Sequence, residues 1–408
     1  MAHDLQDRAD AQVEDRPPGR EGTRRRRGIR GGQGVAGWLF VAPTVAVLGL
    51  FLFVPIVMAL WVSLSDWTGR GSPFSGDVGF VGFENYARIL TEPGLTRSDF
   101  WTSIRNNVYY VLLVVPAQTV LALFLATVLN NQLLKAKGFF RTAFYFPSVT
   151  SSVAISLTFL FLFTGTGAVN TFLAFFGVDG PTWFSDSRGL LHLLGDGIGL
   201  WDTGSPPEAL TGPSALGLSL WEWLAGPSVA LSVIIILVVW TTTGTFLLMF
   251  LAALQDVPVE VEEAAVVDGA NRWQRFRAVT LPHLRPTVLL VLTLGLIGTW
   301  QVFDQIYVMT DGGPAKTTLT PAFLSYFYAF ESFEWGVAAA MSFVLFAIIF
   351  VLTTLQRFLF RDKDAAAERK AQRRQRGRGA RGHRPGQAQA WGVQHSNTAT
   401  SETGGGTE

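Results

Sequence analysis

The sequence predicts an all-α membrane protein with six transmembrane helices, and three observations support this fold class. Of its 408 residues, 49% are hydrophobic and only 15% are charged, whereas soluble domains carry about 25% charged residues. The mean hydropathy is positive, at +0.31, although both ends of the chain are polar. The apolar residues concentrate in six stretches without a charged side chain. This pattern makes a soluble enzyme a poor interpretation.

The six uncharged stretches cover residues 31–65, 106–134, 142–178, 223–255, 286–303 and 335–356. A helix needs roughly 20 residues to cross about 30 Å of hydrocarbon, and all but the fifth stretch exceed this length. The fifth is long enough only if its helix continues through Asp304 to Met309. Because backbone polar groups in a bilayer must be satisfied within the segment, we expect each stretch to be helical.

The Lys and Arg residues predict the orientation. If the helices alternate, residues 1–36, 130–142, 254–286 and 357–408 share one face and carry 26 of the 32 Lys and Arg residues. The positive-inside rule places that face in the cytoplasm. We therefore expect a multi-pass plasma-membrane protein with both termini cytoplasmic. The first stretch is too long for a signal peptide, whose apolar region has roughly 7 to 15 residues.

Both ends of the chain are polar and lack apolar periodicity. We expect residues 1–36 and 361–408 to be disordered tails on either side of a transmembrane domain at residues 37–360. The Arg-rich segment 369–384 could in principle contact nucleic acid. Next to a membrane, such a segment instead favours anionic lipid, so we expect membrane lipid as a partner and no nucleic acid.

Clear helix start and stop signals lie between the fourth and fifth stretches, in the segment QDVPVEVEEAAVVDGANRWQRFRAVTLPHLRP. We expect a helix that Asp256 caps, with Pro258 in its first turn, and that Asp268 and Gly269 break. A second helix can begin at Ala270 or Asn271, and Leu281, Pro282 and Pro286 end it. Small residues at the turn permit close approach, and Phe276 offers a plug for a partner's cleft. An amphipathic helix on the membrane surface is the alternative interpretation.

At these residues the sequence resembles a known family. The string E-A-A-x-x-D-G-A followed by L-P is similar to the EAA loop of binding-protein-dependent ABC importer permeases. Its residues here are Glu263, Ala264, Ala265, Asp268, Gly269, Ala270, Leu281 and Pro282. The segments FENYARIL, FFRTAFYFPSV and FDQIYVMTDGGP, which begin at Phe83, Phe139 and Phe303, resemble carbohydrate permeases of the maltose and glycerol-phosphate type.

The resemblance implies partners and roles. It implies that the loop, including Phe276, inserts into a cleft of a cytoplasmic ATPase, and that Glu263, Asp268 and Gly269 couple the two proteins. It further implies a second permease of the same type, two cytoplasmic ABC ATPase subunits and an extracytoplasmic solute-binding protein. ATP and Mg would be bound by the ATPases, so we expect no cofactor on this chain.

The outer connection between the third and fourth stretches departs from that family's pattern. Members commonly have a short connection with a W-L-x-D-P-type element, whereas here segments 183–186 and 223–227 each resemble part of it. The intervening insertion, at about residues 186–222, is acidic and contains Trp residues. Contact with the solute-binding protein and a passive surface cover are both compatible with this composition.

The sequence lacks the residues that several kinds of chemistry require. The chain has no Cys, and its five His residues are scattered without metal-ligand spacing, so we expect no metal site and no catalytic residue. The segment 312–317 only superficially resembles a phosphate-binding GxxxxGK[ST] loop. Energy must therefore come from another subunit or from an ion gradient. Asp304, in the expected extension of the fifth stretch, is the only ionisable candidate in the six spans for a gradient-driven symporter.

Two stretches flank the predicted docking loop and carry candidates for a solute pathway. Their polar or small residues are Trp240, Thr241 and Thr245 in the fourth stretch, and Gly295, Gly298, Thr299, Val302 and Asp304 in or next to the fifth. Thr and small residues also mediate packing between membrane helices, and that alternative stays open. The sequence thus predicts a non-enzymatic carbohydrate permease of an ABC importer. A symporter, or an ABC permease for another solute, is the alternative.

Overall fold

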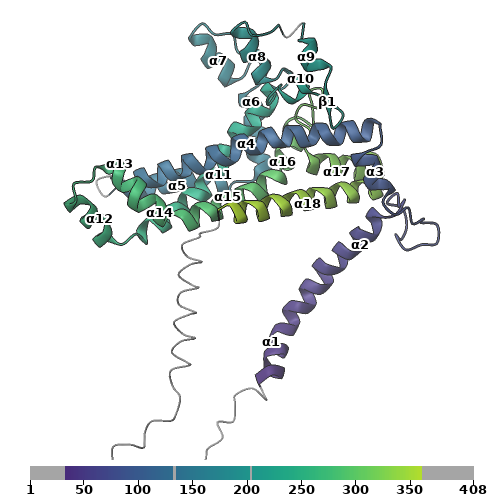
Figure 1. The fold of residues 1–408 in the computed structure, drawn as a ribbon, viewed down its shortest axis with the longest axis horizontal. Coiled ribbons are helices and arrows are strands. Elements are labelled where there is room, and N and C mark those ends of the chain that lie inside the picture. Colours follow the sequence, from purple (N-terminus) through teal and green to yellow (C-terminus); the bar gives the residue numbers. More distant parts are fainter. Residues whose placement is uncertain (1–32, 132–134, 203–204, 361–408) are drawn as a thin grey trace, which may run out of the picture. The chain divides into compact units, whose positions relative to one another are not determined.

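The structure, a computed structural model, describes residues 33–131, 135–202 and 205–360, and the regular secondary structure of this part is almost entirely helical (Figure 1). The strands in this part of the chain are β1 (Ser214–Ala215) and β2 (Leu218–Ser219), which form one short antiparallel pair. The all-α prediction is confirmed. The predicted tails lie outside the described residues, apart from residues 33–36, where α1 (Gln33–Leu48) already begins.

Four helices of the described chain are long and apolar enough to cross a membrane. The first, Gly37–Ser63, runs from α1 through the π-helical turn η2 (Gly49–Phe53) into α2 (Val54–Ser63). The others are α4 (Leu95–Asn130), α11 (Val229–Gln255) and α18 (Trp335–Leu359). They match the first, second, fourth and sixth predicted stretches. Helix α4 begins well before its uncharged stretch, so Arg97 and Arg105 lie within the helix.

The third and fifth stretches are broken. In the third, α5 (Lys137–Val149) and α6 (Ser152–Leu162) meet at an angle of 97°, because Ser151 between them has an extended ψ of 128°. In the fifth, α15 (Arg285–Trp300) ends before Asp304, and α16 (Asp304–Met309) is a separate helix. The expected continuation through Asp304 is therefore wrong. The described chain has six candidate spans only if two bent helix pairs each count as one span. These pairs are α5 with α6, and residues 272–283 with α15 at an angle of 67°, so the six-helix count stays a prediction.

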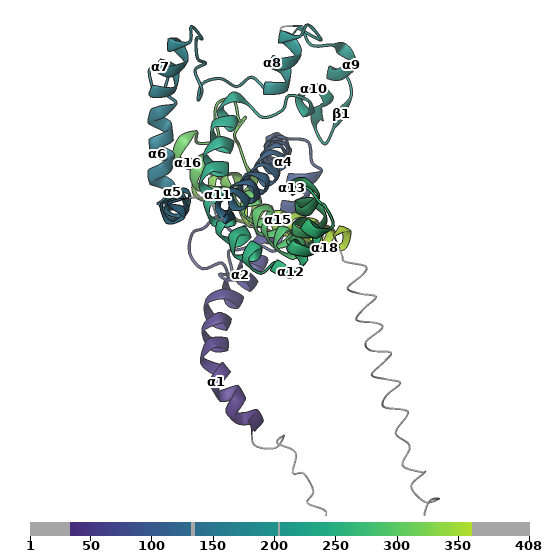
Figure 2. The same ribbon diagram turned by 90° about the vertical axis from the view of Figure 1, so that its left-hand side faces the viewer.

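The chain divides into two compact units. The first contains the described residues of segments 1–117, 146–242 and 298–347, and the second those of segments 118–145, 243–297 and 348–408. The boundaries fall inside α4, α5, α11, α15 and α18, so these helices contribute residues to both units. Figures 1 and 2 show α4, α11 and α15 side by side.

The core of the second unit forms where these three helices pack together. Helix α4 contributes Ala122 and Ala126, whose small side chains permit close approach. Helix α11 contributes Leu247 and Phe250, both fully buried. Leu284, directly before α15, is also fully buried in this cluster. The start of α15 is thereby held against the other two helices.

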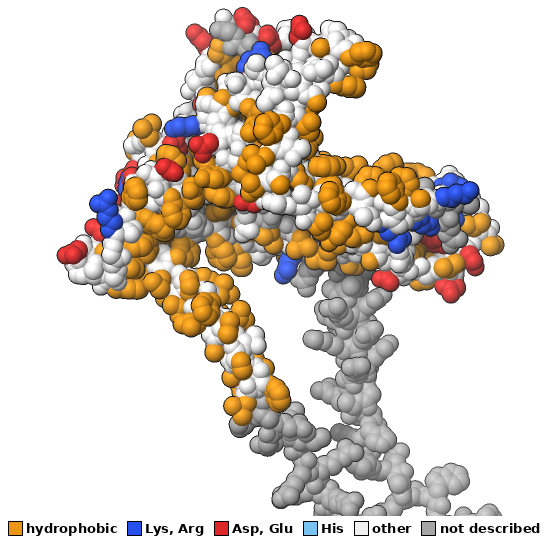
Figure 3. Space-filling view, turned by 180° about the vertical axis from the view of Figure 1, so that it is seen from behind, with side chains coloured by type: hydrophobic (Ala, Val, Ile, Leu, Met, Phe, Trp, Pro, Cys, Tyr) orange, Lys and Arg blue, Asp and Glu red, His pale blue; other side chains and the backbone are white. Residues whose placement is uncertain are grey.

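The first unit also holds the helices α3 (Glu84–Leu90), α7 (Ala168–Phe175), α8 (Leu190–Gly197), α9 (Glu208–Thr211), α10 (Leu220–Trp223), α16 and α17 (Pro321–Phe330). Two ion pairs connect distant segments, Arg88 with Glu334 at 2.8 Å and Lys316 with Asp99 at 2.6 Å. The helix Gly37–Ser63 has only 6% of its most apolar window buried, and Figure 3 shows hydrophobic side chains around it. Such a surface suits contact with lipid.

Candidate functional site

The loop between α11 and α15 begins differently from the sequence prediction. Helix α12 (Val259–Val267) has Pro258 at its N-cap, with ψ of 126° and no side-chain cap. The expectations that Asp256 caps the helix and that Pro258 lies inside it are therefore wrong. Glu260 and Glu262 occupy the first turn, where negative charge is favoured by the positive end of the helix macrodipole.

The turn after α12 explains the D-G-A part of the motif. Asp268 is the C-cap and Gly269 has φ of +81°, a conformation that favours glycine. The Gly269 amide donates to the Val266 carbonyl at 3.0 Å, and the Ala270 amide donates to the Ala265 carbonyl at 2.9 Å. This pair of bonds is a Schellman motif, which satisfies two carbonyls at the helix end. The predicted break at Asp268 and Gly269 is confirmed.

The second helix begins with a capping box. The side chain of Asn271 accepts from the Gln274 amide at 2.9 Å, and the Gln274 side chain accepts from the Asn271 amide at 2.8 Å. Helix α13 (Arg272–Arg275) continues through the π-helical turn η3 (Phe276–Thr280) into α14 (Leu281–His283). It ends at His283, within the predicted end between Leu281 and Pro286, so this prediction is confirmed.

The loop has a buried base and an exposed tip. Val257, Thr280 and Leu284 are buried where the loop meets the long helices of the second unit. In contrast, no residue of α12 is buried, and α12 packs only against α13 and η3 to any extent. The predicted docking residues are exposed at Glu263, Ala264, Asp268, Gly269, Leu281 and Pro282, and half-buried at Ala265, Ala270 and Phe276.

Three exposed apolar side chains at this tip were not singled out from the sequence. Val266, Val267 and Trp273 are 52%, 87% and 66% exposed. Trp273 stacks on Phe276 with ring centroids 5.7 Å apart, which fixes the side chain expected to act as a plug. Adjacent exposed apolar groups rimmed by polar residues mark interaction surfaces. The signal available in the sequence was the pair of valines directly before Asp268, which no polar residue separates.

The solute-pathway candidates do not form one group. Trp240, Thr241, Gly298, Thr299, Val302 and Asp304 belong to the first unit, whereas Thr245 and Gly295 belong to the second. Thr299 and Val302 are 4% and 6% exposed, so both serve packing within their unit. Gly298, next to Thr299, is exposed, with open space where a Cβ atom would lie. The predicted stripe of small residues therefore does not present one common surface.

The candidates on α11 differ in their surroundings. Trp240 is 47% exposed, and its ring lies 5.8 Å from that of Phe159 on α6. The Thr241 hydroxyl donates to the Val238 carbonyl of its own helix at 3.1 Å, which occupies its proton. Thr245 is exposed. The neighbouring Gly244 is buried against α5, and a Cβ atom there would lie 2.2 Å from the Phe144 carbonyl oxygen.

Asp304 lies at the start of α16 and is exposed. Its carboxylate accepts a hydrogen bond of 2.5 Å from the Ser152 hydroxyl at the start of α6. Ser152 directly follows the bend between α5 and α6, so this bond ties the bend to α16. Asp304 is thus a hydrogen-bonded edge residue rather than a buried relay.

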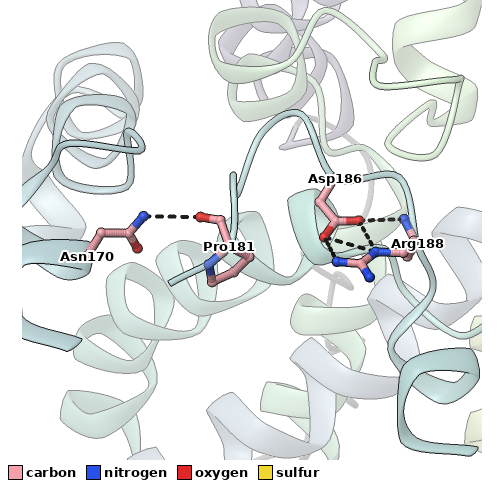
Figure 4. Close-up of polar contacts among 4 residues, drawn as sticks. All are labelled: Asn170, Pro181, Asp186 and Arg188. Carbon is pink, nitrogen blue, oxygen red and sulfur yellow. Dashed lines mark hydrogen bonds and ion pairs between the residues drawn. The ribbon is translucent and has the colours of Figure 1, made fainter. Parts of the chain in front are cut away.

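The outer insertion closes on itself at its base. The Leu190 amide donates to the Pro227 carbonyl at 2.8 Å, and the Val229 amide donates to the Arg188 carbonyl at 3.1 Å. Beside this pairing, the Arg188 side chain binds the Asp186 carboxylate, with Nη2 2.7 Å from Oδ2 (Figure 4). This guanidinium holds the pKa of Asp186 below its usual value. Asn170, also drawn there, donates to the Pro181 carbonyl at 3.1 Å.

The inner part of the insertion is organised by aromatic rings. The His192 imidazole stacks on the Trp221 ring at 3.8 Å, and Trp201 meets Trp221 edge to face at 5.7 Å. The His192 Nε2 atom lies 3.1 Å from the Trp221 carbonyl. Within the described residues, no group of three or more His, Asp or Glu side chains could hold a metal ion.

Comparison with known proteins identifies a matching family model and several similar transport proteins. Residues 118–364 match the family model described as "Binding-protein-dependent transport system inner membrane component". The lactose transport system permease protein LacF of Rhizobium radiobacter is 34% identical over 81% of this chain and 95% of its own length. The multiple sugar-binding transport system permease protein MsmF of Streptococcus mutans is 30% identical over 78% and 93%.

A solved structure shares the fold. It is that of a bacterial alginate ABC transporter in complex with an alginate pentasaccharide-bound periplasmic protein. One of its chains aligns with a TM-score of 0.60 at 19% identity, over 81% of this chain and 95% of that chain.

Proposed function

Since this chain belongs to the family of binding-protein-dependent transport system inner membrane components, we propose that it carries a carbohydrate through the plasma membrane into the cell. It is a permease and not an enzyme. Its solute is a sugar, an oligosaccharide or a polyol phosphate, delivered by an extracytoplasmic binding protein. A second permease completes the pathway, and two cytoplasmic ATPases bind ATP and Mg and supply the energy.

The observation that carries the proposal is the loop tip at Gly269. An exposed helix end, held by a Schellman motif on a buried base, can enter a partner's cleft without distorting the core. Both termini and this loop lie in the cytoplasm, in agreement with the distribution of Lys and Arg. The relatives named for lactose and multiple sugars support the substrate class.

The exposed residues Trp240, Gly298 and Asp304 are the best remaining candidates for contact with the solute. An aromatic face and a carboxylate suit the apolar face and the hydroxyl groups of a sugar. The buried residues Thr299 and Val302 are assigned to packing.

Uptake by reconstituted transporter tests this proposal. Transport of a radiolabelled carbohydrate should require ATP inside and loaded binding protein outside. It should survive a protonophore while ATP is maintained, and Asp304→Asn should retain substantial uptake. Immediate collapse of transport on dissipation of the proton gradient, at constant ATP, would instead favour a symporter that depends on Asp304.

A further inference from the structure

The first unit contains a cavity of about 680 Å³ that lies outside the candidate solute pathway. Helix α2 provides Met58 and Ala59, the segment after α2 provides Trp67, α17 provides Phe330, and α18 provides Trp335 and Ala339. The volume falls in the range of about 300–1,000 Å³ that encloses a small organic ligand.

The walls of this cavity offer little to a polar ligand. Its two serine hydroxyls, of Ser325 and Ser342, lie 2.7 Å apart, and each lies within 3.0 Å of the Ala338 carbonyl. The Trp67 indole donates to the Arg70 carbonyl at 3.1 Å. These groups already have partners, and the other walls are largely aliphatic and aromatic. A sugar would lose its hydrogen bonds to water here without replacement.

The surroundings point to a lipid. Helix α2 ends the span Gly37–Ser63, whose most apolar window is only 6% buried within this chain. Two of the lining residues, Trp67 and Trp335, have rings 5.4 Å apart, and Trp residues are enriched at the membrane–water interface. Arg70 lies between the lining residues Trp67 and Gly71, and its side chain is exposed. An apolar cavity, an interfacial aromatic rim and an exposed cation match the chain, glycerol region and phosphate of one phospholipid.

We propose that this cavity binds one acyl chain of a phospholipid whose phosphate is held at Arg70. The outer leaflet is the source, which rests on the orientation in the proposed function. The binding itself does not depend on which solute the permease carries. Gly69 supports the wall, because a Cβ atom there would lie 2.1 Å from the Trp335 ring.

Photolabelling of the assembled transporter in lipid nanodiscs tests this site. The probe is phosphatidylglycerol with a diazirine in its acyl chain, and the labelled peptides are mapped by mass spectrometry. We expect labelling to concentrate in residues 325–343. Ala59→Phe should lower it about fivefold or more, because a phenyl group fills the space that the chain needs. The control Val57→Phe, on the same helix at a residue that is 62% exposed and outside the cavity, should leave it unchanged.

A second measurement does not depend on the cavity variant. Native mass spectrometry of the transporter with Arg70→Glu should show loss of retained phosphatidylglycerol relative to wild type. The proposal would be overturned if labelling were spread uniformly along α2 or if the two Phe variants had equal effects. It would also be overturned if added carbohydrate protected the cavity from labelling. Efficient crosslinking of the Ala59→Cys variant to the second permease would overturn it as well, since a protein helix would then occupy the cavity.

Discussion

At the scale of single residues, Gly269 has the clearest requirement. Its φ of +81° lies where a side chain costs roughly 1–2 kcal/mol, and its amide closes the Schellman motif. Open space surrounds the position where a Cβ atom would lie. A side chain at this position therefore meets no atom of this chain, but it would meet whatever docks on the tip.

We predict that the Gly269→Asp and Glu263→Lys variants reach the membrane in normal amounts but bind the ATPase more weakly. A loss of roughly 1.4 kcal/mol in docking free energy corresponds to tenfold weaker binding, and we expect at least this from a charge placed or reversed at the tip. Co-purification of the ATPase and uptake provide the measurements. Asp256→Lys is the matched control, because it reverses an exposed charge that does not cap α12. Wild-type co-purification and uptake with both tip variants would contradict the docking role.

We predict that His192 makes the stability of the outer insertion depend on pH. Burial lowers the pKa of its imidazole in the folded state, so the unfolded insertion takes up a proton first as the pH falls through about 6.5. The insertion should therefore lose stability below that pH, until the folded imidazole also titrates. Hydrogen exchange of residues 190–223, corrected for intrinsic rates, should be faster at pH 5 than at pH 7.5. His192→Phe keeps the stacking and removes the titration, so an unchanged pH response in this variant would exclude His192 as the cause.

At the scale of elements, the two π-helical turns share one arrangement. Each ends two residues before a proline, η2 before Pro55 and η3 before Pro282. The amides of Val54 and Leu281 bond five residues back, to the Gly49 and Phe276 carbonyls. The wider turn gives room for the proline ring, which in an α-helix would clash with the carbonyl four residues before it. Both helices thereby continue through a residue that normally ends them.

The crossing of α5 and α11 at Gly244 provides the next prediction. A Cβ atom at Gly244 would lie 2.2 Å from the Phe144 carbonyl oxygen and 3.0 Å from the Tyr145 Cα. Because backbone cannot move as easily as a side chain, we expect Gly244→Ala to destabilise the protein by about 1–3 kcal/mol. Gly298→Ala is the control, since its Cβ atom would meet nothing within 4 Å. Thermal unfolding in detergent compares the two, and equal melting temperatures would show that α5 adjusts freely.

At the scale of the whole molecule, the insertion is built as a removable part. Its base pairs residues 188–191 with residues 225–229, so the chain ends that a deletion leaves are already adjacent. Asp186 and Arg188 belong to this base and should be kept. The cost of removal is the contact with α4, where Tyr109 donates to the Trp223 carbonyl and Arg105 to the Glu222 carbonyl.

We therefore predict that replacing residues 192–224 by two glycines spares membrane insertion and assembly. If the insertion receives the binding protein, uptake should then need a higher concentration of loaded binding protein for its half-maximal rate. Titration of reconstituted transporter with binding protein decides this. An unchanged half-saturation point would show that the insertion is a passive cover and does not receive the binding protein. Failure of the variant to assemble would contradict both roles.

The sequence by itself determined the helical class, four of the spans and the docking motif. These features depend on local composition: uncharged stretches can satisfy their backbones only as helices, and D-G-A forms its turn within six residues. The family resemblance carried by the loop was confirmed by the match over residues 118–364. The roles of the individual loop residues remain predictions.

Only the tertiary structure decided where the other two spans break and which candidate residues are accessible. Thr299 is buried while Gly298 beside it is exposed, a difference set by which neighbouring helices cover each face of α15. The same applies to Gly244, whose small size matters only because Phe144 lies against it. The lipid cavity likewise combines α2 with α17 and α18, more than 260 residues away in the chain. In a membrane protein every helix is apolar on most faces, so hydropathy marks the spans but not the faces that meet.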